Sequence, residues 1–282
     1  FINSDLTSKA DSLNSSILFS NCIFESNITY SHILSQPNTT TFALKINNST
    51  FFNTRINIYG IDTVDINNNR FTCENGKPYN DPTAISFSGR RGNISIIKNY
   101  ISGFYNKGIL INSSGFVLPL GNAIVNIENN SISSSNMSSG ISCYDIATGN
   151  VLYNSISCLK NTVNQNSGIM FGGVKNINLK NNIIYNKYGT AVDVATSSFA
   201  SSDYNVFYTD NYSFRYEGVT KNFADFKSAT GTDTHSIFMN PNYISDNDLH
   251  YTNDTLNGKA TPIAHITEDL QNKKRDLTHP NP

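Results

Sequence analysis

The chain has 282 residues, with 20 Lys and Arg against 21 Asp and Glu, so its formal net charge is −1. This balance argues against nucleic acid as a partner, because phosphate binding needs a concentrated surface of Lys and Arg. No apolar run reaches the ~18–20 residues of a membrane-spanning helix, and the 38% of hydrophobic residues is too many for a disordered chain. Only 15% of the residues are charged, and 43 Asn and 34 Ser largely replace the missing charge.

A short motif recurs along the chain: an apolar residue, two variable positions, Asn, one variable position and a second apolar residue. Eight copies run from Leu18/Asn21/Ile23 to Ser202/Asn205/Phe207, one of them with Ser49 in place of Asn. Successive copies lie 20 to 31 residues apart, which is within the range of solenoid repeats. Apolar residues often alternate before the Asn, and this period of two predicts a strand with one buried face.

A second short strand lies between the motifs, and a small residue opens it. The copies are Ala84-Ile85, Gly108-Ile109, Gly140-Ile141, Gly168-Ile169 and Ala191-Val192. Two or more strands per repeat without a helical period predict a parallel β-solenoid, in which each coil pairs with the coils on either side. Eight coils at ~4.8 Å each would make a rod roughly 35–40 Å long.

The recurring Asn is expected to have a structural role. Asn tolerates the left-handed backbone conformation that a turn between two strands requires. Its amide can also donate to the same Asn one coil away, which would form a ladder. The predicted rungs are Asn21, Asn69, Asn99, Asn130, Asn154, Asn182 and Asn205.

The motif and the Gly-Ile strands resemble the right-handed parallel β-helix of the pectin-lyase-like superfamily, over about residues 16–207. The stretches 203–208, 223–226, 230–236 and 240–241 resemble the closing segment of many secreted bacterial β-helix proteins. The resemblance implies an all-β, right-handed parallel β-helix of about eight coils with an irregular C-terminal cap. It implies a secreted or cell-surface protein but no single chemistry, since the superfamily holds lyases, hydrolases, epimerases and non-catalytic adhesins.

The chain is expected to have two parts. Residues 1–207 would form the coils, with an N-terminal cap missing, and residues 208–282 would form the C-terminal capping segment. In the second part, Asn222 as N-cap and Gly231 as the closing residue predict one short helix. The start within a repeat suggests a monomeric section of a larger chain. The four Cys form no CxxC pair, and buried thiols and a Cys143–Cys158 bridge both fit the sequence.

One outward face of the second strand carries candidates for chemistry. If the Ile side chains point inward, an outward row follows: Ser86, Leu110, Ser142, Met170 and Asp193. Enzymes similar to pectate lyase place several acids for calcium and an Arg or Lys base on such a face. Here Asp193 stands nearly alone, with Asp145 just past its strand, so the acidic cluster of that mechanism is not evident.

The loops that enter these strands are richer in Tyr and Lys, and stacking should place them along one edge. Tyr rings stack on sugar faces, and Lys pairs with uronate carboxylates. The candidates for substrate binding are Tyr79, Tyr105, Tyr144, Lys160, Tyr185, Lys187 and Tyr188. The candidates for catalysis are Arg90, Arg91, Lys107, Asp145 and Asp193. No cofactor is required, and calcium, if used, would bind at Glu74 and Asp81.

The sequence therefore predicts an extracellular β-helix that engages polysaccharide or a cell-surface glycan, as a non-catalytic binding, adhesin or stalk section without membrane insertion. The alternative is an enzyme, with a polysaccharide lyase acting by β-elimination on a uronic-acid polymer favoured over a glycoside hydrolase. Geometry separates the two. An enzyme needs titratable groups with perturbed pKa values that converge within about 3–6 Å, whereas a stalk has scattered, solvated charges.

Overall fold

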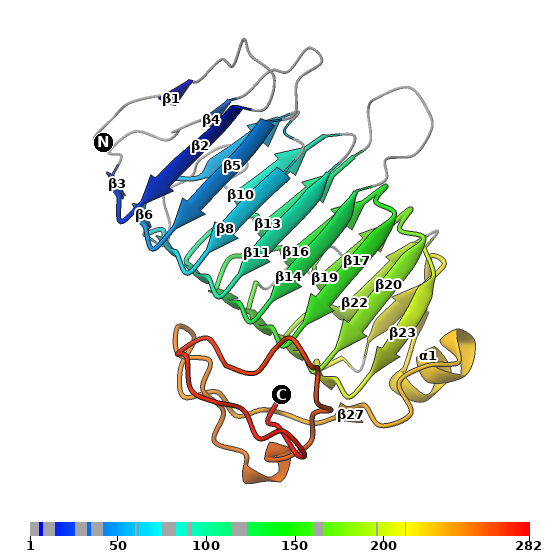
Figure 1. The fold of residues 1–282 in the computed structure, drawn as a ribbon. Helices are drawn as coiled ribbons and strands as arrows, with labels where there is room; N and C mark the ends of the chain where they lie inside the picture. The colour runs from blue at the N-terminus through cyan, green and yellow to red at the C-terminus, as the bar shows by residue number, and fades with distance from the viewer. Residues whose placement is uncertain are drawn as a thin grey trace.

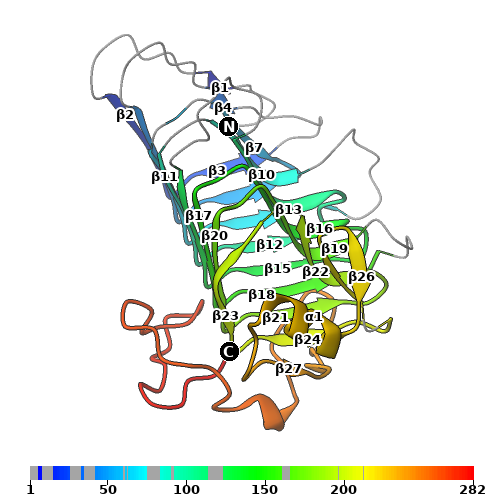
Figure 2. The same ribbon diagram turned by 90° about the vertical axis from the view of Figure 1, so that its right-hand side faces the viewer.

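The protein is a parallel β-solenoid, in which the chain winds through three sheets and each full turn adds one strand to each of them (Figures 1 and 2). The computed structural model describes residues 6–7, 15–25, 33–34, 42–59, 61, 63–74, 83–89, 92–113, 123–160, 166–195, 197–211 and 213–282. We number the sheets in the order in which each turn visits them. No described helix is both long and apolar enough to cross a membrane.

Within each sheet, neighbouring strands come from successive turns. The first sheet contains β2 (Ser15–Ser20), β5 (Phe42–Asn47), β8 (Thr63–Asn67), β11 (Asn93–Ile97), β14 (Ile124–Glu128), β17 (Thr148–Leu152), β20 (Asn176–Lys180) and β23 (Phe199–Asp203). The second contains β3 (Ile23–Glu25), β6 (Thr50–Phe52), β9 (Arg70–Thr72), β12 (Tyr100–Ser102), β15 (Ser131–Ser134), β18 (Ser155–Cys158), β21 (Ile183–Asn186), β24 (Val206–Tyr208) and β27 (Ile237–Phe238). The third contains β7 (Ile56–Tyr59), β10 (Thr83–Ser88), β13 (Lys107–Asn112), β16 (Ser139–Tyr144), β19 (Ser167–Gly172), β22 (Thr190–Ala195), β25 (Phe214–Tyr216) and β26 (Val219–Lys221).

The all-β solenoid fold is as predicted, but it makes about six turns rather than eight. The end copies of the motif belong to turns that are less regular. At one end β1 (Leu6–Thr7) pairs only with β4 (Ile33–Leu34). At the other end β26 turns back antiparallel on β25.

The core is a column of Ile, Val and Phe side chains between the three sheets. Phe24, Phe51 and Phe71 stack from turn to turn, with ring centroids 4.5 and 4.4 Å apart. Cys143 and Cys158 are fully buried in this column, and all four Cys are free thiols. Burial raises the pKa of each of these two thiols to about 12. The buried-thiol alternative therefore holds for Cys143 and Cys158, whereas Cys22 and Cys73 are half-buried, and Cys143 and Cys158 form no disulfide bridge.

An Asn ladder joins the turns between the first and second sheets, as the repeat predicts. The backbone N–H and the side-chain amide of Asn99 both donate to Oδ1 of Asn130, at 2.9 and 3.0 Å. The same amide donates back to the Ile66 carbonyl at 2.9 Å. Equivalent bonds continue through the remaining rungs, all of them buried: Asn69, Asn154, Asn182 and Asn205. Each rung thus satisfies buried polar groups of the turns on both sides.

The left-handed residue of each turn is not the rung, contrary to our prediction. It is the residue before the rung, as in Lys98, Tyr153 and Asn181, whose φ angles are 54°, 56° and 60°. The rung side chain points into the turn and makes the ladder, while the preceding side chain points out. Each turn therefore divides between two neighbouring residues the roles that the sequence pattern assigned to one Asn: one residue takes the left-handed conformation, and the next makes the ladder.

Asn21 is not a rung, and the first copy of the motif is displaced by one residue. Asn21 is exposed and takes the left-handed conformation with φ 55°. The rung position belongs to Cys22, whose backbone N–H donates to Oγ of Ser49 at 3.1 Å. Accordingly Phe24 pairs with Phe51 and is buried, whereas Ile23 is 62% exposed. A slip of one residue exchanges the two faces of a strand, so the predicted inward residues of this copy point outward.

Small residues open the strands of the third sheet because the second sheet passes close by. A Cβ on Gly140 would lie 2.4 Å from Cγ2 of Ile156, and one on Gly168 would lie 2.4 Å from Cγ2 of Ile184. Both distances are far below van der Waals contact. The corner between the two sheets therefore has no room for a Cβ at Gly140 or Gly168.

Residues 208–282 first extend the solenoid and then close it. The helix α1 (Phe223–Thr230) has the predicted caps: Oδ1 of Asn222 accepts from the Asp225 N–H at 2.9 Å, and Gly231 ends the helix with φ 65°. Its buried Phe226 packs on Phe214 with ring centroids 4.9 Å apart, which covers the end of the core.

The chain then folds back along the coils instead of continuing past the last one (Figure 1). We call residues 239–282, which include the 3₁₀ helix η1 (Asp254–Leu256), the C-terminal strap. The Tyr100 hydroxyl donates to the Asn247 carbonyl at 2.8 Å, and the Tyr153 hydroxyl donates to the Thr261 carbonyl at 2.7 Å. Arg275 stacks on the Tyr153 ring at 3.9 Å. The strap therefore covers part of the second sheet and of the ladder edge.

Candidate functional site

The outward row predicted on the third sheet exists. Ser86, Leu110, Ser142, Met170 and Asp193 are paired in register along β10, β13, β16, β19 and β22. A second row runs beside it: Ser88, Asn112, Tyr144, Gly172 and Ala195. The two rows bring Tyr144, Met170 and Asp193 onto one face of the sheet.

Asp193 is buried on this face and is paired with Arg215. Its carboxylate forms an ion pair with the Arg215 guanidinium at 3.3 Å. Arg215 lies on β25, directly beside Asp193 in the register of the two strands. Oδ1 of Asp193 has no hydrogen-bond partner among the described residues. Burial raises the pKa of the Asp193 carboxyl, and Arg215 opposes part of that rise. Arg215 was not a candidate from the sequence, because it lies in the part expected to be a cap.

The ring of Tyr144, on β16, packs over Gly172 of the neighbouring strand β19. A Cβ on Gly172 would be 2.8 Å from Cδ1 of Tyr144, so the ring occupies the space that a larger residue at Gly172 would fill. The Tyr144 hydroxyl lies 2.9 Å from the Met170 sulfur. Burial raises the pKa of Tyr144, and a hydrogen bond with Ser142 lowers it in part. Tyr144 and Asp193 are near enough that the carboxylate charge contributes to the rise.

The loops that enter the third sheet bring predicted Tyr and Lys residues together. Nζ of Lys160, from the loop between β18 and β19, lies 4.6 Å from the ring centroid of Tyr105, from the loop between β12 and β13. Between β21 and β22, Nζ of Lys187 lies 5.2 Å from the Tyr188 ring centroid. A hydrogen bond with Tyr188 raises the pKa of Lys187. We call the edge formed by these loops the loop edge.

Lys107, the first residue of β13, also lies at the loop edge, whereas other predicted residues lie apart from it. Asp145 follows the last residue of β16, so it occupies the opposite edge of the third sheet, separated from Lys107 by roughly 20 Å of strand. Tyr185 belongs to β21 of the second sheet, where its ring centroid lies 5.6 Å from that of Tyr208 and 6.3 Å from that of Tyr243. Tyr79, Asp81, Arg90 and Arg91 lie outside the described residues.

Glu74 and Asp81 were the residues expected to bind calcium if the chain uses it. Glu74 is exposed, and its backbone N–H donates to Oδ1 of Asn53 at 2.9 Å. In the described part of the chain, no three His, Cys, Asp or Glu side chains come together as metal ligands would. Of the two residues predicted to bind calcium, only Glu74 is described, and it is not part of a cluster of metal-binding side chains among the described residues.

The chain was compared with family models, with curated proteins and with solved structures, and none of them matches it.

Proposed function

We propose that this chain is a right-handed β-helix of the pectin-lyase-like kind, secreted or on the cell surface, that engages polysaccharide along its loop edge without cleaving it. The observation that carries the proposal is the stacking of Lys160 on Tyr105, 4.6 Å apart and contributed by loops two turns apart in the solenoid. Lys187 and Tyr188 repeat the combination one turn further on.

The chemistry of the loop edge suits an acidic polymer. Aromatic faces such as that of Tyr105, which is 43% exposed, pack on the apolar faces of sugar rings. The Lys ammonium groups beside these rings can pair with carboxylates of the polymer. The formal net charge of −1 gives the whole chain no general attraction for polyanions, so the binding of an acidic polymer would depend on these local groups. Since the loops repeat along a rigid axis, the edge offers similar contacts to successive units of a chain. A solenoid of this kind would hold glycan at a fixed distance, as a stalk or adhesin does.

A polysaccharide lyase is the second candidate, and Asp193 favours it. A carboxyl whose pKa is raised by burial, beside the cation of Arg215 and near the Tyr144 hydroxyl, is the kind of group that exchanges protons in catalysis. In β-elimination a base removes the proton next to the uronate carboxylate, the bond to the leaving sugar breaks, and an acid protonates the leaving oxygen. Asp193 and Tyr144 are the described groups to test for these two roles.

One experiment separates the candidates. The purified chain is run in affinity gels containing acidic or neutral polysaccharides, and the same polymers are incubated with it, with and without calcium. Retardation by one polymer without new reducing ends supports the binding function. Ultraviolet absorbance from unsaturated sugars would identify a lyase, and new reducing ends without absorbance would identify a hydrolase. A chain that is neither retarded nor active on any polymer contradicts the proposal.

A further inference from the structure

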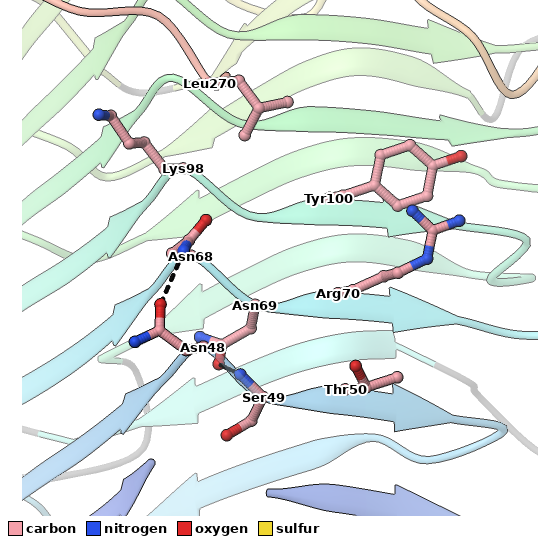
Figure 3. Close-up of a pocket in the computed structure, with 9 residues that line it drawn as sticks. All are labelled: Asn48, Ser49, Thr50, Asn68, Asn69, Arg70, Lys98, Tyr100 and Leu270. Atoms are coloured by element: carbon pink, nitrogen blue, oxygen red, sulfur yellow. Dashed lines mark hydrogen bonds between the residues drawn. The ribbon is translucent and has the colours of Figure 1, made fainter. Parts of the chain in front are cut away.

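A pocket of about 330 Å³ opens on the ladder edge, away from the third sheet (Figure 3). The turns that precede β6, β9 and β12 form its walls, and Leu270 of the C-terminal strap forms one side. The volume is near the lower end of the range for small-molecule sites, about 300–1,000 Å³, and suits a ligand of one or two sugar units.

Two amide side chains line the pocket because their residues take the left-handed turn position. Asn48 and Asn68 have φ angles of 52° and 56°, and both side chains are exposed. The Asn68 amide donates to Oδ1 of Asn48 at 2.7 Å. Within the described part of the chain, Nδ2 of Asn48 and Oδ1 of Asn68 have no partner, so the pair offers one donor group and one acceptor to a ligand.

Arg70 supplies a cation whose position is fixed. Its guanidinium carbon lies 4.2 Å from the ring centroid of Tyr100, and Figure 3 shows the guanidinium group against that ring. The Tyr100 hydroxyl is held by the Asn247 carbonyl at 2.8 Å. No carboxylate of the described residues forms an ion pair with Arg70. Stacking on an aromatic ring leaves the N–H groups at the edge of the guanidinium plane available to a carboxylate.

Two acidic residues of the C-terminal strap, Glu268 and Asp269, already have partners. The Glu268 carboxylate forms ion pairs with Lys98 at 3.1 Å and with Lys274 at 2.7 Å. The Lys98 ammonium group also donates a hydrogen bond to Oδ1 of Asn272 at 2.7 Å. Oδ1 of Asp269 accepts from the backbone N–H groups of its own loop. Of the two cations that line the pocket, Lys98 is paired with Glu268, whereas Arg70 pairs with no carboxylate of the described residues.

We infer that this pocket is a second sugar site, which binds a single uronic acid unit through its carboxylate. Arg70 would receive the carboxylate in a two-pronged hydrogen bond, and Asn48 and Asn68 would bond ring hydroxyls. The choice of a uronic acid as ligand rests on the proposed polysaccharide function, but the site is separate from the loop edge. Neither Arg70 nor Tyr100 was a candidate from the sequence, because they join only when successive turns stack.

The test is a calorimetric titration of the full chain with trigalacturonic acid and with its methyl ester, which lacks the charge. Wild type is expected to bind the free acid at least about tenfold more tightly than the ester, and Arg70→Gln is expected to lose that difference. Arg70→Lys should recover only part of it, because Lys cannot form the two-pronged bond. The matched control is Lys175→Gln, which removes an exposed cation just before β20, outside both the pocket and the loop edge, and should keep the wild-type difference between acid and ester.

Equal binding of acid and ester by wild type, no binding of the acid, or an unchanged affinity in Arg70→Gln would each overturn this second site. The proposed function fails separately, when wild type is not retarded by any polymer in the affinity gels. Retention of polymer binding together with an Arg70→Gln variant that binds the trimer like wild type would reject the pocket alone. Circular dichroism of each variant checks that the fold is intact, since Arg70 is exposed and its loss should not unfold the chain.

Discussion

At the scale of single residues, the buried amide of each rung holds two turns together. Asn130 is 1% exposed, donates to the Ile96 carbonyl at 2.8 Å and to Oδ1 of Asn154 at 2.9 Å, and accepts two bonds from Asn99. Without this side chain, the backbone N–H and the side-chain amide of Asn99 would lose this acceptor in the interior. Buried polar groups without partners are among the costliest defects in a folded protein.

Asn130→Ala is therefore expected to lower the free energy of unfolding by about 3 kcal/mol, measured by urea denaturation. The control is Asn21→Gly. Asn21 is exposed and left-handed, and Gly takes that conformation easily, so the change should cost less than about 0.5 kcal/mol. Equal losses in the two variants would show that Asn21 is a rung after all.

Asp193 allows a prediction about pH. Burial raises its pKa above the ordinary value of 3.8, so the folded state holds the proton more tightly than the unfolded state does. Its contribution to stability is then complete below the ordinary pKa and is lost as the pH rises through the raised value. Asp193→Asn removes this loss, and the variant should gain stability relative to wild type between pH 3 and pH 7.

Thermal unfolding of wild type and Asp193→Asn across this pH range makes the comparison. Arg215→Gln is the useful second variant, because it removes the opposing cation and should raise the pKa of Asp193 further. If Asp193→Asn instead loses stability relative to wild type as the pH rises, the Asp193–Arg215 pair favours the charged carboxyl and the assigned direction is wrong.

The sequence predicted most rungs, and it failed where the pattern is ambiguous. Around Asn69 and Asn130, apolar and polar residues alternate, so only one register buries the apolar set. Around Asn21 the stretches Ile17-Leu18-Phe19 and Cys22-Ile23-Phe24 are apolar on both faces. Packing of Phe24 on Phe51 then selects the register that places Cys22 at the rung.

At the scale of the strands, the corner between the second and third sheets depends on glycine. Gly140→Ala would place a methyl group 2.4 Å from Ile156 Cγ2 and 2.9 Å from the Gly168 carbonyl oxygen. We expect a loss of about 2 kcal/mol in the free energy of unfolding, because neither neighbour can move without disturbing the stack. Gly149→Ala is the control, since its nearest atom would be 3.4 Å away, and it should be close to neutral. A neutral Gly140→Ala variant would mean that the corner is looser than described.

The small residues that open these strands could be recognised in the sequence, but their reason could not. The pattern of Gly-Ile pairs indicates a strand, and only the structure places Ile132, Ile156 and Ile184 of the second sheet against those glycines. The capped helix was fully predictable, because Asn222 and Gly231 act within one short segment. Short sequence patterns thus predicted the strands and the helix, whereas the contacts between neighbouring turns are visible only in the structure.

At the scale of the whole molecule, stacking determines which distant residues meet. Lys160 and Tyr105 are 55 positions apart, and Arg215 meets Asp193 only through the register of β25 with β22. Because turns differ in length, the sequence predicted that Tyr and Lys share an edge but not which of them touch. The C-terminal strap was expected at the last coil, and instead its contacts lie along the second sheet and the ladder edge.

The most direct test of the account is the binding of the chain to the polysaccharide that retards it most strongly, compared among three variants. Tyr105→Ala and Lys160→Gln alter the loop edge, while Lys45→Gln removes an exposed cation from the first sheet. We predict that both loop-edge variants weaken binding at least about fivefold and that Lys45→Gln binds like wild type. If Lys45→Gln weakens binding as much as Lys160→Gln does, or if neither loop-edge variant changes it, the loop edge is not the binding site.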